Sequence, residues 1–341
     1  MKVSILLPYK ENFSPEYAGA VSLFVKDTVK ISNYKKNITV YGNTSYKKGF
    51  KIKYKNLNLK KKFLNSTSKI YVKSFLNEEL KNNSDIIEIH NRPLYVKPIV
   101  DVINSKIILY YHNDPLSMSG SESDDDRMYL LKKCEYIIVI SEWIKKRLLK
   151  NLNVDNTLLQ KIHVIPHSTK KIKNSNLINS KEKIIIFVGK LNSQKGYDIF
   201  GNVIIKILNK NNSWKSVVVG DEEREKLTFN HNRLNIMGFI EHNKVLKLFE
   251  KSSIAVVPSR WQEPLGRTGL EASSRGCATI VSNRGGLPET ITDGIIINKL
   301  NEKELFKQIQ LLIDNKKLRN KLQKQSILNF KLDHGVIAKK I

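Results

Sequence analysis

Short runs of branched apolar residues alternate with longer amphipathic stretches along the first half of the chain. The runs are VSILLP (3–8), ITVY (38–41), IIEI (86–89), KIILYY (106–111), YIIVI (136–140) and IHVIP (162–166). Helical patterns lie between most of them, for example over residues 20–32 and 142–152. Because strands that alternate with helices form parallel sheets covered on both faces, the pattern predicts an α/β domain.

The same rhythm starts again after a polar stretch at 170–183. Its apolar runs are IIIFVG (184–189), SVVVG (216–220), RLNIMG (233–238), IAVVPS (254–259) and ATIVS (278–282). Residues 302–330 are charged and amphipathic and predict two helices. We therefore expect two Rossmann-like α/β domains, at residues 1–170 and 171–325, with residues 326–341 packing back on the first. Ligands bind beyond the carboxyl ends of parallel strands, so two such sheets facing across a cleft suit a group transfer.

Composition narrows the class of protein. A chain of 341 residues with 40% hydrophobic content is typical of a globular protein with two cores. No apolar run reaches the roughly 18 residues of a membrane-spanning helix, and MKVSILLPYKE (1–11) is predicted to be a first strand, not a signal peptide. Cys134 and Cys277 lie far apart and give neither a metal spacing nor a disulfide framework. We expect a cytoplasmic protein.

The formal net charge of +27 raises the question of a polyanionic partner. The densest basic segment, residues 46–63, interleaves Lys with Tyr, Phe and Leu, which would suit peripheral contact with an anionic membrane at its inner face. No nucleic-acid motif is present, so no nucleic-acid partner is expected. The alternative is that abundant Lys only reflects composition, with no partner at all.

Two segments of the second half carry candidate chemistry. In FVGKLNSQKGYD (187–198), Lys190 and Lys195 follow a strand and precede a helix, where backbone N–H groups already favour an anion such as a diphosphate. The spacing is not that of a P-loop, and two solvated lysines are the alternative. In VPSRWQEPLGRTGLE (257–271), a short helix is predicted over 267–274. Glu271 on that helix could accept hydrogen bonds from vicinal hydroxyls, and Glu263 precedes it; a helix-dipole role is the alternative.

These segments resemble a known family. EPLGRTGLE (263–271) matches the E-x7-E motif of the retaining, nucleotide-sugar-dependent glycosyltransferases of the GT-B fold, family 4. VGKLNSQKG, PSRWQEPLG, GGLPE and TDG stand in the order and spacing of that family between residues 184 and 294. The first half resembles it more weakly, in YAGAVSLFV (17–25), YYHND (110–114) and VISEWIKKRL (139–148).

The resemblance implies a role for each matched residue. His112 and Glu263 would lie by the transferred sugar as the catalytic residues. Glu271 would bind the donor ribose, and Lys190 and Lys195 the departing diphosphate. The complete donor-binding set that it implies is Gly19, Lys190, Lys195, Leu265, Gly266, Arg267 and Glu271, in which the residues at 265–267 would act through backbone N–H groups and Gly19 by close approach of the first loop to the phosphates.

The resemblance also implies a type of reaction. Cleavage of an anomeric C–O bond leaves a diphosphate that gains negative charge, and Lys side chains and N–H dipoles would stabilise it without a metal. No cofactor is expected beyond the nucleotide-sugar co-substrate, and the acids in SESDDDR (121–127) are predicted to start a helix and not to bind a metal. Retention allows either double displacement or same-face attack, and the family points to the second.

The implied activity is transfer of a hexose or related sugar from a UDP-, GDP- or ADP-sugar to a glycan or lipid-linked acceptor. Two alternatives stay open from the sequence. The same fold could serve an epimerase or phosphorylase, or the chain could be a basic membrane- or nucleic-acid-binding module that has lost catalysis.

Overall fold

The computed structural model describes residues 1–16, 18–57, 59, 66–172, 175–338 and 340. Parts of four segments discussed above lie outside these ranges: residue 17, residues 58 and 60–63 of the lysine-rich segment, residues 173–174, and residues 339 and 341 of the C-terminal segment. The chain divides into two compact units. The first comprises Met1–Pro166 with Ile337–Ile341, and the second comprises His167–Val336.

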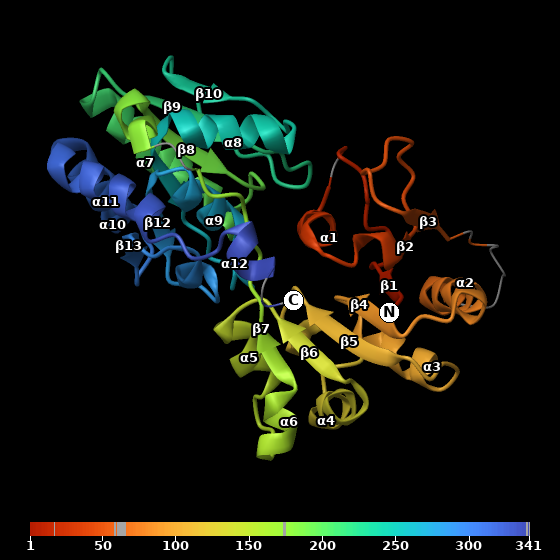
Figure 1. Ribbon diagram of the computed structural model, residues 1–341. Helices are drawn as coiled ribbons and strands as arrows, with labels where there is room; N and C mark the ends of the chain where they lie inside the picture. The colour runs from red at the N-terminus through yellow and green to blue at the C-terminus, as the bar shows by residue number, and fades with distance from the viewer. Residues whose placement is uncertain (17, 58, 60–65, 173–174, 339, 341) are drawn as a thin grey trace. The chain divides into compact units, whose positions relative to one another are not determined.

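A parallel sheet of seven strands forms the centre of the first unit, in the order β3-β2-β1-β4-β5-β6-β7 (Figure 1). Its strands are β1 (Val3–Leu6), β2 (Ile38–Gly42), β3 (Tyr54–Asn56), β4 (Ile86–His90), β5 (Lys106–Tyr111), β6 (Tyr136–Val139) and β7 (Ile162–Val164). The chain leaves β1 toward one edge and returns to start β4 on its other side. The carboxyl ends of β1 and β4 therefore flank a point where the strand order reverses.

Helices cover both faces of this sheet. They are α1 (Ala20–Ile31), α2 (Thr67–Asn82), α3 (Val96–Val100), α4 (Asp124–Lys133), α5 (Glu142–Leu148) and α6 (Asn156–Gln160). Figure 1 shows α1 on one side of the sheet and α4 and α5 on the other. The inward face of α1 carries Val21, Phe24, Val25 and Val29, which recur at helical spacing and are buried.

The second unit has a parallel sheet of six strands in the order β10-β9-β8-β11-β12-β13. Its strands are β8 (Glu182–Val188), β9 (Lys215–Val219), β10 (Leu234–Ile236), β11 (Ser252–Val257), β12 (Ala278–Ser282) and β13 (Gly294–Ile297). Its helices are α7 (Tyr197–Lys210), α8 (His242–Lys251), α9 (Arg267–Ser274), α10 (Glu302–Asp314) and α11 (Lys316–Leu328); α12 (His334–Ala338) follows. The strand order reverses here between β8 and β11.

Alternation along β8 explains how this second sheet is covered on both faces. Ile185 and Phe187 belong to a core formed with α7 and α10, whereas Ile184 and Ile186 belong to a core formed with α8 and α9. Successive side chains of a strand point to opposite faces, so an uninterrupted apolar run is what a sheet buried on both sides requires.

Most elements agree with the sequence-based expectation. Two parallel α/β sheets are present, the helix at 267–274 has the predicted bounds, and Glu302–Phe330 contains α10 and α11. Asp124–Asp126 form the first turn of α4, as predicted for SESDDDR, and Ser123 caps it. Two strands were missed. β3 is an exposed, lysine-bearing edge strand with little apolar pattern, and β13 follows directly on a turn motif.

Candidate donor site in the second unit and His112 in the first

The loop after β8 holds Lys195 in a fixed position. Asn192 accepts a hydrogen bond from the Lys195 backbone N–H at 3.0 Å, which caps the 3₁₀ turn at Ser193–Lys195. Gly196 follows with φ +73°, and a Cβ there would lie 1.9 Å from the Pro258 carbonyl oxygen. Only glycine allows the chain to turn this close to the segment after β11. Lys190 lies earlier in the same loop and is exposed.

The side chains of Lys195 and Glu263 form an ion pair. Lys195 Nζ lies 2.6 Å from Glu263 Oε1, and the Ser259 hydroxyl donates to the same oxygen at 2.9 Å. Glu263 is 7% exposed, and its carbonyl accepts a hydrogen bond from the Gly286 N–H at 2.7 Å. The GGLPE motif thus holds the backbone of Glu263 while Lys195 and Ser259 hold its carboxylate.

Helix α9 starts at the carboxyl edge of the sheet. Gly266 is its N-cap with φ +97°, and no side chain caps the first turn. A Cβ on Gly266 would lie 2.4 Å from Leu287 Cδ1, while Leu265 beside it is buried. The Thr268 hydroxyl donates to the Val188 carbonyl at 3.4 Å and so joins this turn to the end of β8. The first turn of α9 therefore lies at the reversal point between β8 and β11, where ligands of such sheets bind.

Glu271 is held as a carboxylate by two basic side chains. Its Oε1 accepts hydrogen bonds from Arg267 Nε at 2.6 Å and from His242 Nε2 at 2.8 Å. Burial acts to raise the pKa of Glu271, but the charge of Arg267 and the hydrogen bond and charge of His242 outweigh it and lower that pKa to about 2. His242, at the start of α8, was missed by the sequence analysis because no motif marks it.

In the first unit, His112 follows β5 and is buried. Its backbone N–H donates to Asn91 Oδ1 at 3.1 Å, and its Nε2 lies 3.0 Å from His90 Nδ1. Burial, followed by the neighbouring His90, lowers the pKa of His112 well below the ordinary value, and burial lowers that of His90 to about 3. Both imidazoles are therefore neutral at physiological pH.

Gly19 is the N-cap of α1, where the structure places a carboxylate. Glu11 Oε1 accepts a hydrogen bond from the Ser22 N–H at 3.0 Å, and a Cβ on Gly19 would lie 2.5 Å from that oxygen. The Glu11 carboxylate thus fills the space beside Gly19, and a Cβ there would require the end of that side chain to move. A phosphate at this helix start would meet a negative charge.

The predicted residues fall into two groups. The structure brings Lys195 into contact with Glu263, and Arg267 into contact with Glu271; Lys190, Leu265 and Gly266 lie at the same edge of the second sheet. His112 and Gly19 belong to the first unit. Within the described ranges, no group of three or more His, Cys, Asp or Glu side chains could hold a metal ion. Cys134 and Cys277 are buried free thiols.

Comparison with known proteins assigns a family to the segment that contains the candidate donor-site residues. Residues 168–328 match the family described as "Glycosyl transferases group 1". This part of the chain belongs to the group 1 glycosyltransferases. The match spans the loop of Lys190 and Lys195 and the whole of EPLGRTGLE, so the motifs that suggested the family lie inside the region that establishes it.

Relatives and a solved structure extend the likeness over most of the chain. Spore coat protein SA of Bacillus subtilis is 23% identical over 362 aligned positions, covering 96% of this chain and 93% of that protein. YtcC of the same organism is 26% identical over 284 positions, covering 73% of this chain and 69% of that protein. The crystal structure of Anabaena HepE with UDP-glucose matches 100% of this chain and 98% of its own, with a TM-score of 0.77 at 14% identity, which establishes the GT-B fold.

Proposed function

We propose that this glycosyltransferase moves a sugar from a nucleoside diphosphate sugar to a glycan or lipid-linked acceptor, with retention of the anomeric configuration and without a metal ion. The observation that carries the proposal is the arrangement at the carboxyl edge of the second sheet. There an ionised Glu271, the Lys195–Glu263 pair and the uncapped first turn of α9 lie around the reversal of the strand order. HepE, which shares the fold, has been crystallised with UDP-glucose.

The donor binds through charges that suit its two halves. Glu271, kept anionic by Arg267 and His242, accepts hydrogen bonds from the ribose hydroxyls. Lys190, Lys195 and the N–H groups at 265–267 bind the diphosphate. As the anomeric C–O bond breaks, negative charge moves onto the leaving phosphate, and these cations and dipoles stabilise the transition state more than the ground state.

Same-face attack fits the environment of Glu263 better than double displacement does. A nucleophilic carboxylate needs a lone pair directed at the anomeric carbon. Glu263 Oε1 accepts from both Lys195 and Ser259, which lowers the nucleophilicity of the carboxylate, and the residue is almost fully buried. Glu263 therefore orients Lys195 and the sugar-facing loop, and the departing phosphate accepts the proton of the acceptor hydroxyl. His112 contacts the transferred sugar as a neutral imidazole.

Incubation with radiolabelled UDP-, GDP- and ADP-sugars in excess EDTA tests this function. We expect release of the nucleoside diphosphate with at least one donor, an α-anomeric product from an α-linked donor by NMR, and loss of turnover in Glu271→Ala. The variant Glu302→Ala, which removes a surface carboxylate of the same unit, should stay active. Failure of every donor to bind or react would refute the proposal, and loss of turnover in EDTA that Mg²⁺ or Mn²⁺ restores would refute its metal-independence.

The acceptor side includes a proposed peripheral contact with an anionic membrane through the lysine-rich segment. Lys47, Lys48, Lys51, Lys53 and Lys55 are exposed, whereas Phe50 and Tyr54 pack on Phe13 at ring distances of 5.0 and 5.4 Å. Attraction through these lysines would thus be electrostatic, without insertion of Phe50 or Tyr54. No helix in the described part of the chain has the length and apolarity needed to cross a bilayer. Sedimentation with anionic vesicles that survives Lys→Glu changes at these five positions would refute this contact.

A further inference from the structure

Four polar side chains lie in a row on one face of the first sheet. Glu88 and His90 are two residues apart on β4, and Tyr110 and His112 are two residues apart at the end of β5. His90 pairs with Tyr110 in the parallel register, and their rings stack with centroids 4.3 Å apart. Alternate residues of a strand share a face, so the fold aligns these side chains along the sheet.

The row is connected atom by atom. Glu88 Oε2 lies 3.4 Å from His90 Nε2, and His90 Nδ1 lies 3.0 Å from His112 Nε2. Both rings of the histidine pair are almost fully buried, and Phe24 of α1 packs edge-on against His112 with centroids 5.1 Å apart. Each imidazole thus uses a defined nitrogen toward its neighbour, and the order from the carboxylate is Glu88, His90, His112.

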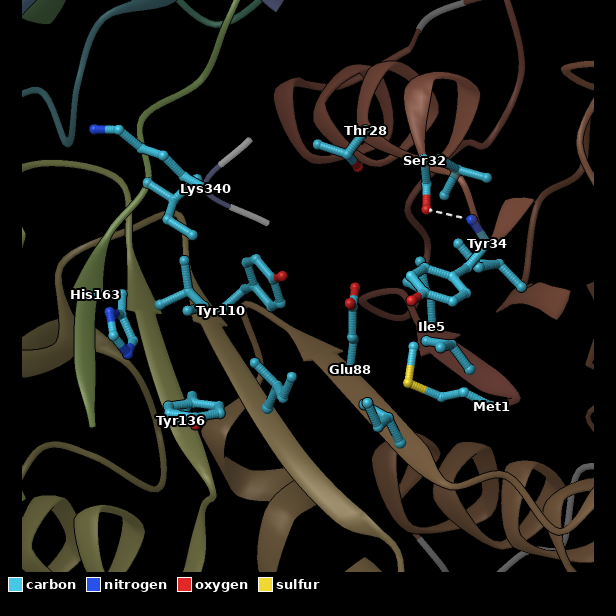
Figure 2. A pocket seen from close by; sticks show the side chains of 17 residues that line it. Met1, Ile5, Thr28, Ser32, Tyr34, Glu88, Tyr110, Tyr136, His163 and Lys340 are labelled. Carbon is cyan, nitrogen blue, oxygen red and sulfur yellow. Dashed lines mark hydrogen bonds between the residues drawn. The ribbon is translucent and has the colours of Figure 1, made fainter. Parts of the chain in front are cut away.

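Glu88 is the end of this row that faces open space. Figure 2 shows its carboxylate directed into a cavity of about 430 Å³ beside Tyr110. The apolar lining of this cavity includes Ile5, Ile108 and Ile138, and Thr28 of α1 and Ser32, which follows that helix, also line it. The other titratable side chains that line it are Tyr34, Tyr110, Tyr136, His163 and Lys340. Met1 also lines it, and its amino group is 3.7 Å from Asp85.

We infer that Glu88 and His90 are positioning residues for His112, because the proton on Glu88 sets the tautomer of His90 and, through it, which nitrogen of His112 carries hydrogen. The inference rests on the proposed role of His112 at the transferred sugar and adds two residues that act through it. Neither Glu88 nor His90 touches the reacting atoms.

Each protonation state of Glu88 corresponds to one arrangement of hydrogen bonds along Glu88, His90 and His112. With Glu88 ionised, His90 Nε2–H donates to the carboxylate, His90 Nδ1 accepts from His112 Nε2–H, and His112 Nδ1 is an acceptor. With Glu88 protonated, its O–H donates to His90 Nε2, His90 Nδ1–H donates to His112 Nε2, and His112 Nδ1–H is a donor. One proton enters from the cavity on Glu88, and both imidazoles stay neutral throughout.

Near neutral pH, Glu88 is protonated in part of the molecules and ionised in the rest, so both arrangements of hydrogen bonds are populated. Burial raises the pKa of Glu88 to about 7, against a smaller lowering by the Tyr110 hydroxyl. The imidazoles do not compete for the proton, because burial holds the pKa of His90 at about 3 and that of His112 well below its ordinary value. The hydrogen-bonding character that the His112 ring offers to a sugar hydroxyl therefore differs between the two states.

Nitrogen-15 NMR of the histidine rings tests the inference without any substrate. The chain has seven histidines, and His112→Gln assigns the signals of His112. We compare the wild type about two pH units below and about two pH units above the pKa of Glu88. Between these two conditions, we expect the nitrogen-15 chemical shifts of His112 Nδ1 and Nε2 to interchange, because a different ring nitrogen carries the hydrogen. In Glu88→Gln, whose amide does not titrate, they should stay constant. Glu79→Gln changes another buried carboxylate of the same unit, bonded to Ser84, and should respond like the wild type.

A pH-independent His112 tautomer in the wild type, or an unchanged response in Glu88→Gln, would overturn the inference; the wild-type titration decides even if the variant folds poorly.

A kinetic experiment separates this result from the proposed function. Where a donor turns over, kcat should show an inflection near the pKa of Glu88 that Glu88→Gln removes while the KM for the donor changes less than about twofold. If the His112 tautomer changes with pH but no donor reacts, the proposed function is refuted, whereas the inference about Glu88, His90 and His112 is supported.

Discussion

Lys195 Nζ lies 2.6 Å from Glu263 Oε1, although 68 residues separate the two along the chain. The pair joins the loop after β8 to the loop after β11, on the two sides of the reversal in strand order. A buried carboxylate costs free energy unless a cation or donors compensate it, and here Lys195 and Ser259 do so. The pair thus fixes the position of the ammonium group that we propose binds the diphosphate.

Replacement of Lys195 by Met should weaken binding of the nucleoside diphosphate that corresponds to the active donor. We expect a loss of about 10- to 100-fold, the effect of one charge-assisted hydrogen bond. Isothermal titration calorimetry measures this directly. Lys206→Met is the matched control, because Lys206 also pairs with a glutamate, Glu302, at 2.9 Å but on an exposed surface of the same unit. Equal affinity losses in the two variants would show that Lys195 acts only through overall charge.

Glu271→Gln should make the second unit less sensitive to acid. The folded-state pKa of Glu271 is lowered from 4.5 to about 2, so its ionised form stabilises the fold above the unfolded pKa. That contribution is lost as pH falls toward the folded value. The wild type should exceed the variant by on the order of 2–3 kcal/mol in free energy of unfolding at neutral pH, and by little near pH 2. Urea unfolding across this range checks it; a constant difference at all pH values would contradict it.

Glu88→Gln should show the opposite dependence. The folded pKa of Glu88 is raised from 4.5 to about 7, so the stability linked to its protonated form is complete below the unfolded pKa and is lost as pH rises through the folded one. The free energy of unfolding of the variant should equal that of the wild type at acidic pH. In alkali it should exceed that of the wild type by on the order of 2–3 kcal/mol. Thermal unfolding monitored at both extremes measures the sign; a wild type that is more stable than the variant in alkali would refute it.

Gly196→Ala should destabilise the second unit by about 2–4 kcal/mol, because it combines a positive φ with a Cβ only 1.9 Å from the Pro258 carbonyl. Gly238→Ala separates the two causes. Gly238 has φ +63°, but a Cβ there would have no neighbouring atom within 4 Å, so its variant should cost about 1–2 kcal/mol. Urea denaturation compares them, and equal costs would mean that close approach to Pro258 contributes nothing.

The sequence alone determined the alternation of elements and predicted where the candidate donor site lies. Branched apolar runs such as 184–189 are typical of strands buried on both faces, as in a parallel sheet covered by helices. The strand ends and glycines of VGKLNSQKG and EPLGRTGLE are local signals, so the helix at 267–274 and the candidates Lys195, Glu263 and Glu271 followed from nearby residues.

Tertiary structure decided which side chains meet. His242 reaches Glu271 from another helix, and Glu88 is connected through His90 to His112, which follows the neighbouring strand. The edge strand β3 likewise exists because β2 pairs with it. Such contacts depend on strand order and register, which join residues tens of positions apart and leave no periodic trace in the sequence near either partner.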